Sequence, residues 1–176
     1  MAVIRMTGFP GSGKSTLAER AAKLLGYDLH QIGKIFRREA DILHMSIEDY
    51  YRQVDTAFER EVDRLQEELM MRNDDLVVDG RMAPWLRCGF RAVNVKVVVS
   101  QTEGALRLLR RPENRDRTVA EMITRAAERI ILEREHFRSL YGIADHLDGR
   151  FDIVLDTTKW TEEETLQRFL ESFRRL

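Results

Sequence analysis

The segment Gly8-Phe-Pro-Gly-Ser-Gly-Lys-Ser15 constrains what this chain can fold into more than any other part of the sequence. It follows a short apolar run at residues 3–6, which predicts a buried strand, and a helical pattern begins directly after it at Thr16. Glycine, glycine, lysine and serine occupy the fixed positions of the pattern G-x-x-x-x-G-K-[ST]. A strand, a glycine-rich loop of this spacing and a helix together predict a phosphate-binding loop.

The residue types of this loop suit a nucleoside triphosphate such as ATP. Its glycines allow the backbone to turn so that successive N–H groups point at phosphate oxygens, and the following helix adds the positive end of its dipole. Lys14 can reach the β- and γ-phosphates, and the Ser15 hydroxyl can bind Mg²⁺. The expected contacts are Gly8, Gly11, Ser12, Gly13, Lys14, Ser15 and Thr16. The alternative, a glycine-rich turn without a ligand, does not account for the flanking strand and helix.

Composition and charge narrow the class of protein. The 176 residues suit one domain, and 29 basic against 30 acidic residues give a net charge of -1, which offers no overall electrostatic footprint for nucleic acid. No apolar run approaches the roughly 20 residues that span a membrane, and a loop beginning at residue 8 leaves no room for a signal peptide. The single cysteine, Cys88, suits a packing role in a reducing compartment better than a catalytic role. We therefore expect a cytoplasmic protein that binds neither membranes nor nucleic acid.

Hydrophobic periodicity predicts strands that alternate with helices. Strands are expected at residues 3–6, 27–32, 76–79, 93–100 and 151–155. Helices are expected at residues 15–25, 34–43, 46–71 with a break around Val54-Asp55, 102–111, 118–140 and 160–176, with a loop at 81–91. In the helix at 46–71 the expected apolar face consists of Phe58, Val62, Leu65 and Leu69. Such alternation is typical of a parallel α/β sheet whose binding edge lies at the strand ends, here Gly8, Gly33, Asp79, Ser100 and Asp156.

Two motifs at these strand ends bring arginine to the binding edge. Gly33-Lys-Ile-Phe-Arg37 follows the second strand, and the Arg37 guanidinium can hold a phosphate with a fork of donors. Asp79-Gly80-Arg81 follows the third strand. Asp79 there can hold the water shell of Mg²⁺, and the flexible Gly80 lets Arg81 turn into the cleft. The alternatives are a surface arginine and an ordinary Asp-Gly turn, but beside a phosphate-binding loop both motifs favour a second phosphate site.

The segment beyond the fourth strand and the helix that follows are rich in arginine. The arginines are Arg107, Arg110, Arg111, Arg115, Arg117, Arg125 and Arg129. Phosphoryl transfer mainly requires alignment and charge neutralisation, which arginines on a mobile segment can supply while excluding water. Most of them can equally be solvated or pair with Glu113, Asp116, Glu121 and Glu128. We therefore expect two or three to act, Arg111 and Arg129 first, and the four histidines show no spacing typical of metal ligands.

The order of these motifs resembles the nucleoside monophosphate kinases, and more closely the short cytidylate kinases of the archaeal type. The motifs are the phosphate-binding loop, G-x-I-F-R at residues 33–37, Glu59-Arg-Glu-Val-Asp63, D-G-R-M-A-P-W at residues 79–85, Tyr141-Gly-Ile143 and Asp156-Thr-Thr-Lys-Trp160. The resemblance covers residue 3 to about residue 172. It implies a P-loop NTPase three-layer sandwich with a five-stranded parallel sheet of order 2-3-1-4-5, in a single domain over residues 1–176. An acceptor-binding region is then expected at about residues 33–72 and a lid at about 107–125.

The same resemblance implies transfer of the γ-phosphoryl group of ATP to CMP or dCMP with Mg²⁺. The acceptor phosphate would be held by Arg37 and Arg81, beside Asp79 and Gly80, and the Mg²⁺ by Ser15 and Asp79. Lys14, Arg111 and Arg129 would act on the transferring phosphates, and the stretch at residues 157–160, with Thr158 and Trp160, would lie near the adenine. The sequence departs from the family pattern in three places. Lys34 stands where members often have Asp, and Lys14 stands where many have Thr. The segment at residues 110–117 differs from the expected lid sequence.

The acceptor and the partners have alternatives at this stage. A carboxylate such as Asp55 or Asp63 could accept a hydrogen bond from the cytosine 4-amino group, but nothing in the sequence excludes adenine or uracil. The same motifs also fit two other functions. The chain could be a kinase for another nucleotide or a sugar acid, or a module that binds a nucleotide without transferring a phosphoryl group. The expected partners are small nucleotides, and a kinase of this size that closes a lid needs no second subunit, so we expect a monomer.

Overall fold

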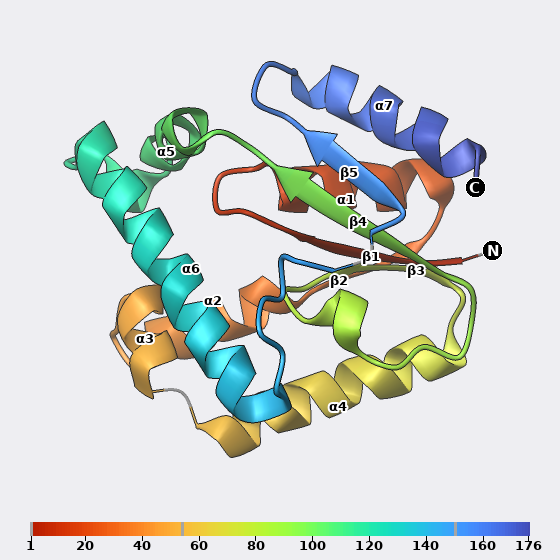
Figure 1. Ribbon diagram of the computed structural model, residues 1–176, viewed down its shortest axis with the longest axis horizontal. Coiled ribbons are helices and arrows are strands. Elements are labelled where there is room, and N and C mark those ends of the chain that lie inside the picture. Colours follow the sequence, from red (N-terminus) through yellow and green to blue (C-terminus); the bar gives the residue numbers. More distant parts are fainter. Residues whose placement is uncertain (1, 54, 150) are drawn as a thin grey trace.

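Five strands form one parallel sheet at the centre of the molecule (Figure 1). The computed structural model describes residues 2–53, 55–149 and 151–176. The strands are β1 (Ala2–Gly8), β2 (Asp28–Gln31), β3 (Asp75–Asp79), β4 (Ala92–Val98) and β5 (Ile153–Asp156). They pair in the order β2-β3-β1-β4-β5, so the expected α/β fold with strand order 2-3-1-4-5 is confirmed.

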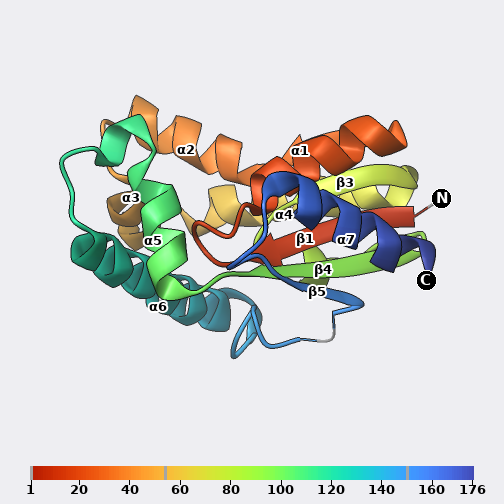
Figure 2. The same ribbon diagram turned by 90° about the horizontal axis from the view of Figure 1, so that it is seen from above.

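Helices cover both faces of this sheet. The helices α1 (Lys14–Leu25) and α7 (Glu162–Arg174) lie on one face, and α4 (Thr56–Arg72) lies on the other (Figures 1 and 2). Successive residues of a strand point to opposite faces, so Ile4 packs in the core cluster on the α1 side and Val3 in the cluster on the α4 side. Every residue of β1 is buried, including Arg5, whose guanidinium donates to Oδ1 of Asn94 at 2.8 Å and to the carbonyl oxygen of Leu86 at 2.7 Å. In the part of the chain that the structure describes, no helix combines the length and apolar character needed to cross a membrane.

The remaining helices gather near the carboxyl ends of the strands. These are α2 (Ile32–Ile42), α3 (Ile47–Gln53), α5 (Gln101–Leu109) and α6 (Val119–Tyr141) (Figure 1). α6 packs against α5 and also contacts α3. The parallel register pairs Met6 of β1 with Asp79 of β3, so the loop after β1 and the carboxylate at the end of β3 start from neighbouring points. The candidate site lies at this edge of the sheet.

Three local elements near this edge differ from the sequence-based expectation. The loop expected at residues 81–91 contains a short 3-10 helix, η1 (Ala83–Trp85), and the arginine-rich stretch contains another, η2 (Pro112–Asn114). Each has a proline in its first two positions, where the fixed backbone angle of proline favours such a turn. The second strand ends at Gln31, so Gly33 lies in the first turn of α2 and not at the strand end.

The helical region that follows is interrupted where the sequence predicts a break. α3 ends at Gln53 and α4 begins at Thr56, while Val54 lies outside the described residues. The Asp55 carboxylate accepts a hydrogen bond from the amide of Ala57 at 2.8 Å and so caps the start of α4. This capping role, at an exposed position, explains why Asp55 does not reach the interior as a base-reading carboxylate.

α4 turns a partly polar face toward the interior. Val62 is buried as the predicted apolar stripe requires, but Leu65 is 51% exposed, so the stripe is wrong at that position. Glu59, Asp63 and Gln66 are buried instead, at spacings of four and three residues that place them on one helical face. Apolar periodicity does not identify such a face, because polar partners rather than apolar contacts hold its side chains.

Candidate active site

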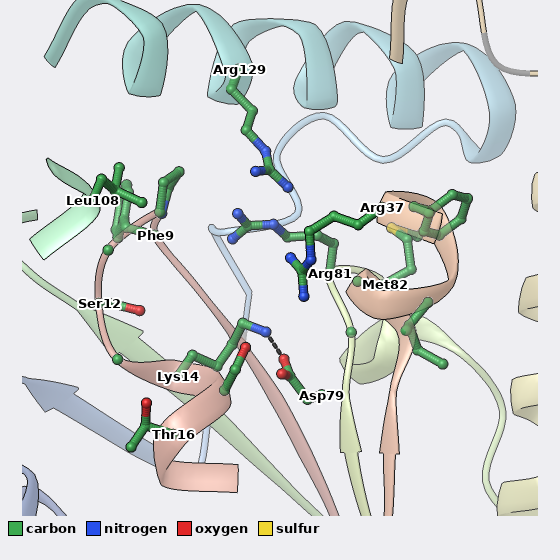
Figure 3. Close-up of a pocket in the computed structure, with 18 of the residues that line it drawn as sticks. Phe9, Ser12, Lys14, Thr16, Arg37, Asp79, Arg81, Met82, Leu108 and Arg129 are labelled. Atoms are coloured by element: carbon green, nitrogen blue, oxygen red, sulfur yellow. Dashed lines mark ion pairs between the residues drawn. The ribbon is translucent and has the colours of Figure 1, made fainter. Parts of the chain in front are cut away.

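The loop after β1 carries a lysine that is paired at the sheet edge. Gly11 has φ 76°, and a side chain there would collide with the backbone of Gly104, so glycine is required. Lys14 begins α1, and its Nζ forms an ion pair with the carboxylate of Asp79 (Figure 3). The two side chains are only 14% and 3% exposed. The register of β1 and β3 thus brings two of the predicted motifs into direct contact.

One pocket joins this loop to the arginines that the sequence singles out. Figure 3 shows Arg37, Arg81 and Arg129 pointing into the same space beside Lys14, from α2, the segment after β3, and α6. The predicted residues that line the pocket are Gly11, Ser12, Gly13, Lys14, Ser15, Thr16, Arg37, Asp79, Gly80, Arg81, Arg111 and Arg129. Gly8 is the predicted loop residue outside this lining; it ends β1, where a side chain would meet the backbone of Val97.

Cationic side chains outnumber carboxylates in the described lining of the pocket, by five to three. Burial lowers the pKa of Lys14 well below its ordinary value, and the charges of Arg81 and Arg129 lower it further. Clustered cations repel one another, and a bound anion that carries several negative charges relieves this repulsion. The electrostatics of the pocket therefore favour phosphate groups between the loop and the arginines.

A buried carboxylate lies behind two of these arginines. The Nε of Arg129 donates to Oε1 of Glu133 at 2.9 Å, and the Nε of Arg81 lies 3.2 Å from Oε2 of the same residue. Glu133 is fully buried in α6. Sequence reasoning missed it, because nothing distinguishes one glutamate in the middle of a charged helix from its neighbours.

The polar face of α4 forms the far wall of the pocket. Gln66 donates from Nε2 to Oδ1 of Asp63 at 2.7 Å, and the hydroxyl of Tyr141 donates to Oδ2 at 2.7 Å. Burial raises the pKa of Asp63 to about 6, although both hydrogen bonds favour its ionised form. Among the described residues, none forms a hydrogen bond with the buried Oε1 of Gln66. Glu59 lies on the same wall and pairs with His136.

Gly80 makes room for this wall. A Cβ atom at position 80 would lie 3.0 Å from Oε1 of Gln66 and 3.0 Å from Cγ1 of Ile32, closer than an ordinary contact. The glycine of the Asp79-Gly80-Arg81 motif therefore allows α4 and α2 to approach the end of β3. Gln66 was not identified from the sequence, and its place three residues after Asp63 on a helix is the signal that could have found it.

A second pocket opens on the other side of the loop. It is lined by residues that include Gly11, Thr16, Arg107, Arg110, Arg111, Thr157 and Trp160. Arg107 donates to Oγ1 of Thr157 at 2.9 Å and to its carbonyl oxygen at 2.6 Å. The Thr157 hydroxyl in turn donates to the carbonyl oxygen of Ser12 at 2.9 Å, which ties the segment after β5 to the loop. Trp160, predicted near the adenine, lies in this lining.

Thr158 and Lys34 are placed differently from the other predicted residues. The Thr158 hydroxyl donates to Oδ1 of Asp156 at 2.6 Å and accepts from the amide of Ser100 at 2.9 Å. Thr158 is not among the described residues that line either pocket; its neighbour Thr157 is. Lys34, which departs from the family pattern, is exposed and pairs with Glu19 at 3.3 Å, away from the pocket.

The arginine-rich segment divides into groups. Arg111 and Arg129 line the pocket beside Lys14, whereas Arg107 and Arg110 line the second pocket. A further cleft between α2, α3 and α6 includes Arg117 and Arg125 in its lining. Arg115 is exposed and is not among the described residues that line these pockets. The two arginines expected first are therefore those that reach the main pocket from this segment and α6.

The donor set in the main pocket fits Mg²⁺. The pocket contains the Ser15 hydroxyl and the Asp79 carboxylate, and Mg²⁺ is usually bound by one or two such oxygen ligands together with phosphates and water. No group of three or more His, Cys, Asp or Glu residues that could hold a metal ion occurs within residues 2–53, 55–149 and 151–176. A site of this kind needs no such group, because the substrate and water supply the remaining ligands.

Comparison with known proteins agrees with this geometry. Residues 4–130 match the family model described as an AAA domain. The chain is 32% identical to the cytidylate kinase of Thermoplasma volcanium over 163 residues, which cover 92% of this chain and 85% of that protein. It is 31% identical to the cytidylate kinase of Pyrococcus abyssi, over 92% of this chain and 87% of that protein.

Solved structures share the fold at low sequence identity. An uncharacterized protein from Eubacterium ventriosum superposes with a TM-score of 0.70 at 12% identity, over 100% of both chains. Shikimate kinase from Acinetobacter baumannii superposes with a TM-score of 0.62 at 14% identity, over 99% of this chain and 94% of that one. These neighbours bear on the fold alone, whereas the two curated relatives match 92% of this chain. The chain therefore belongs to the nucleoside monophosphate kinase family, and within it to the archaeal type.

Proposed function

We propose that this kinase transfers the γ-phosphoryl group of ATP to CMP or dCMP. The observation that carries the proposal is the shared pocket of Lys14, Arg37 and Arg81, in which a donor-phosphate loop and two candidate acceptor arginines face one space. Phosphoryl transfer requires the donor and acceptor phosphates to be held in line at close range, and one pocket with two phosphate-binding sides meets this requirement. Relatives named cytidylate kinase at 32% and 31% identity support cytosine as the acceptor base.

In this proposal the side chains position phosphates and neutralise charge. Lys14 leaves Asp79 for the β- and γ-phosphates when ATP binds, while Arg37 and Arg81 hold the acceptor phosphate opposite the γ-phosphate. Arg111 and Arg129 neutralise the negative charge that develops during transfer, and the low dielectric around the largely buried Arg129 strengthens its effect. No general base is required, because alignment and electrostatic stabilisation provide most of the reduction in barrier.

The same pocket would hold the metal ion. Ser15 and Asp79 would provide oxygen ligands, directly or through water, once Lys14 has moved to the phosphates. Mg²⁺ bound there would neutralise charge on the β- and γ-phosphate oxygens. The Lys14–Asp79 ion pair keeps the buried carboxylate compensated before either ligand arrives.

The polar residues of α4 that line the pocket favour a nucleoside monophosphate whose base carries an amino group. Oε1 of Gln66 is a buried acceptor without a hydrogen-bond partner among the described residues, and the carboxylate of Asp63 lies beside it. The 4-amino group of cytosine can donate to such acceptors. Uracil has a carbonyl oxygen in place of the 4-amino group. This oxygen would face Oε1 of Gln66, and both acceptors would be buried without a hydrogen-bond donor. We therefore assign the contact with the cytosine 4-amino group to Asp63 and not to Asp55, the other carboxylate considered from the sequence.

The regions expected from the sequence take corresponding parts in the proposal. Residues 33–72 supply Arg37, Asp63 and Gln66 and would form the acceptor region, and residues 107–125, which supply Arg111, would form the lid. In this proposal the chain acts as a monomer on Mg·ATP and a nucleoside monophosphate, because a kinase of this size that closes a lid needs no second subunit. The balanced charge argues against a nucleic-acid partner, and the single thiol of Cys88 suits a reducing, cytoplasmic setting.

An acceptor panel tests this function. The purified chain with Mg·ATP is offered CMP, dCMP, UMP, AMP, GMP, shikimate and gluconate separately, and ADP formation is measured above an acceptor-free control. We expect the highest kcat/KM with CMP or dCMP. A higher value with another nucleotide or a sugar acid would replace the acceptor assignment, and ATP binding without stimulation by any acceptor would indicate a nucleotide-binding module.

A further inference from the structure

Glu133 contacts two phosphate-facing arginines without reaching the pocket itself. Its side chain is fully buried, and it is not among the described residues that line the pocket, whereas Arg81 and Arg129 are. Each carboxylate oxygen meets a different arginine: Oε1 accepts from Nε of Arg129 at 2.9 Å, and Oε2 lies 3.2 Å from Nε of Arg81. Nε2 of the buried His146 lies 3.4 Å from Oε2 on another side.

The contacts fix the orientation of both guanidinium groups. Glu133 accepts a hydrogen bond from Nε of Arg129 and forms an ion pair with Nε of Arg81 at 3.2 Å, and Figure 3 shows the ends of both side chains directed into the pocket. The arginines come from different elements, Arg81 from the segment after β3 and Arg129 from α6. A single carboxylate therefore sets the position of an acceptor-side group relative to a group on the long helix.

The charge of Glu133 matters as much as its shape. Burial by itself would raise the pKa of Glu133, but Arg81 and Arg129 outweigh burial and hold its pKa far below the ordinary value, so it is ionised at neutral pH. Without this negative charge, two guanidinium groups would face each other in a poorly solvated site and repel. An ordinary surface ion pair would have no such effect, because water would screen it.

We propose that Glu133 is a positioning residue for phosphoryl transfer, which holds Arg81 and Arg129 at the separation that aligns the acceptor phosphate with the transferring phosphate. This inference rests on the proposed function of the pocket. It adds a dependence that the lining residues alone do not imply: turnover requires a buried side chain that touches neither nucleotide.

Glu133→Gln tests the proposal with almost no change in shape. Its amide has one acceptor oxygen, and its NH₂ end would face a donor, so at least one arginine must be released. We expect kcat to fall about 100-fold, since small displacements of aligned groups carry costs of this order. The Kd for ATP should change less than about 3-fold, because the loop and Lys14 are untouched. Glu135→Gln, an exposed change two residues away on the same helix, should leave both values unchanged.

A second readout is independent of the acceptor. In ¹⁵N NMR spectra the Nε–H signals of Arg81 and Arg129, assigned with Arg81→Lys and Arg129→Lys, should exchange slowly with solvent in the unaltered protein and in Glu135→Gln. At least one should lose this protection in Glu133→Gln. Protected signals together with inactivity toward CMP would refute the proposed function and leave the contact standing. Unprotected signals in the unaltered protein would overturn the inference.

Two kinetic outcomes decide the remaining cases. Unchanged kcat in a folded Glu133→Gln protein would overturn the positioning role. Should that protein fail to fold, Arg129→Lys carries the test, because an ammonium keeps the charge but has no Nε edge with which to bind Glu133 while it reaches the pocket. A fall in kcat at unchanged Kd for ATP would support the proposal, and full kcat in Arg129→Lys would contradict it.

Discussion

The ammonium group of Lys14 and the carboxylate of Asp79 form a buried ion pair where β1 and β3 end side by side. The pair connects the donor loop to the motif that also supplies Arg81. Its two members have different tasks in the proposed reaction, Lys14 on the phosphates and Asp79 on Mg²⁺. The contact therefore belongs to the nucleotide-free state and should exchange for ligand contacts on binding.

Lys14→Ala should reduce turnover about 1000-fold, since it removes the cation that contacts the transferring phosphate. Far-UV circular dichroism should be retained, but the melting temperature should fall because Asp79 is left buried without its partner. Adding Asp79→Asn to the same chain should recover stability and not turnover. Near-normal turnover in Lys14→Ala would show that the loop does not act on the phosphates as described.

Arg81→Ala should raise the KM of the acceptor at least about 10-fold, which is the usual cost of losing a charged hydrogen bond to a phosphate. The KM of ATP should change much less, since the donor loop stays in place. Arg115→Ala, at an exposed arginine away from the pockets, is the matched control and should leave both constants unchanged. Steady-state kinetics in both substrates make the comparison, and equal increases for ATP and acceptor would argue against an acceptor site at Arg81.

Gln66→Leu should narrow the preference for CMP over UMP. The ratio of their kcat/KM values should fall at least about 10-fold, because the buried amide oxygen that accepts from the 4-amino group is gone. Gln167→Leu changes an exposed glutamine on α7 in the same way and should leave the ratio unchanged. If Gln66→Leu keeps the ratio of the unaltered enzyme, another part of the pocket reads the base.

Asp63 should make stability depend on pH. Its pKa of about 6 in the folded state lies above that of a free carboxyl, so the unfolded chain loses this proton first as the pH rises. Folding then takes up a proton between about pH 4 and pH 6, and the contribution of Asp63 to stability falls by about 3 kcal/mol over that range. Asp63→Asn cannot titrate. Urea unfolding from pH 4 to 7.5 should show the unaltered protein losing stability relative to Asp63→Asn, and parallel curves would contradict the raised pKa.

The sequence predicts the elements that follow local rules. The spacing of the glycine-rich loop and the apolar runs beside it depend on near neighbours in the chain, and they predict the phosphate-binding loop and the alternation of strands with helices. The sheet order followed from the family resemblance, and the contact between Lys14 and Asp79 is visible only in the structure. Arg37 and Arg81 could be proposed because both follow predicted strands. Parallel strands bring such positions to one edge of the sheet.

The residues that sequence reasoning missed depend on contacts between distant elements. Glu133 forms an ion pair with Arg81, which is 52 positions away in the chain and lies in the segment after β3. Leu65 fits the apolar stripe of α4, yet the helix turns Asp63 and Gln66 inward, where Tyr141 and the amide of Gln66 both donate to the Asp63 carboxylate. Asp55 and Asp63 look equivalent in the sequence. The structure distinguishes them, because α4 begins at Thr56, so that Asp55 caps the helix whereas Asp63 faces the pocket.

In the proposed reaction, the loop and the arginines form one site that holds donor and acceptor together. A bisubstrate ligand, adenosine and cytidine joined through their 5′ positions by five phosphates, measures this directly by isothermal titration calorimetry in the presence of Mg²⁺. We predict one ligand per chain, bound at least about 100-fold more tightly than ATP or CMP alone because the second half binds intramolecularly, with weaker binding in both Lys14→Ala and Arg81→Ala. Binding no tighter than that of ATP, or insensitivity to Arg81→Ala, would contradict the account.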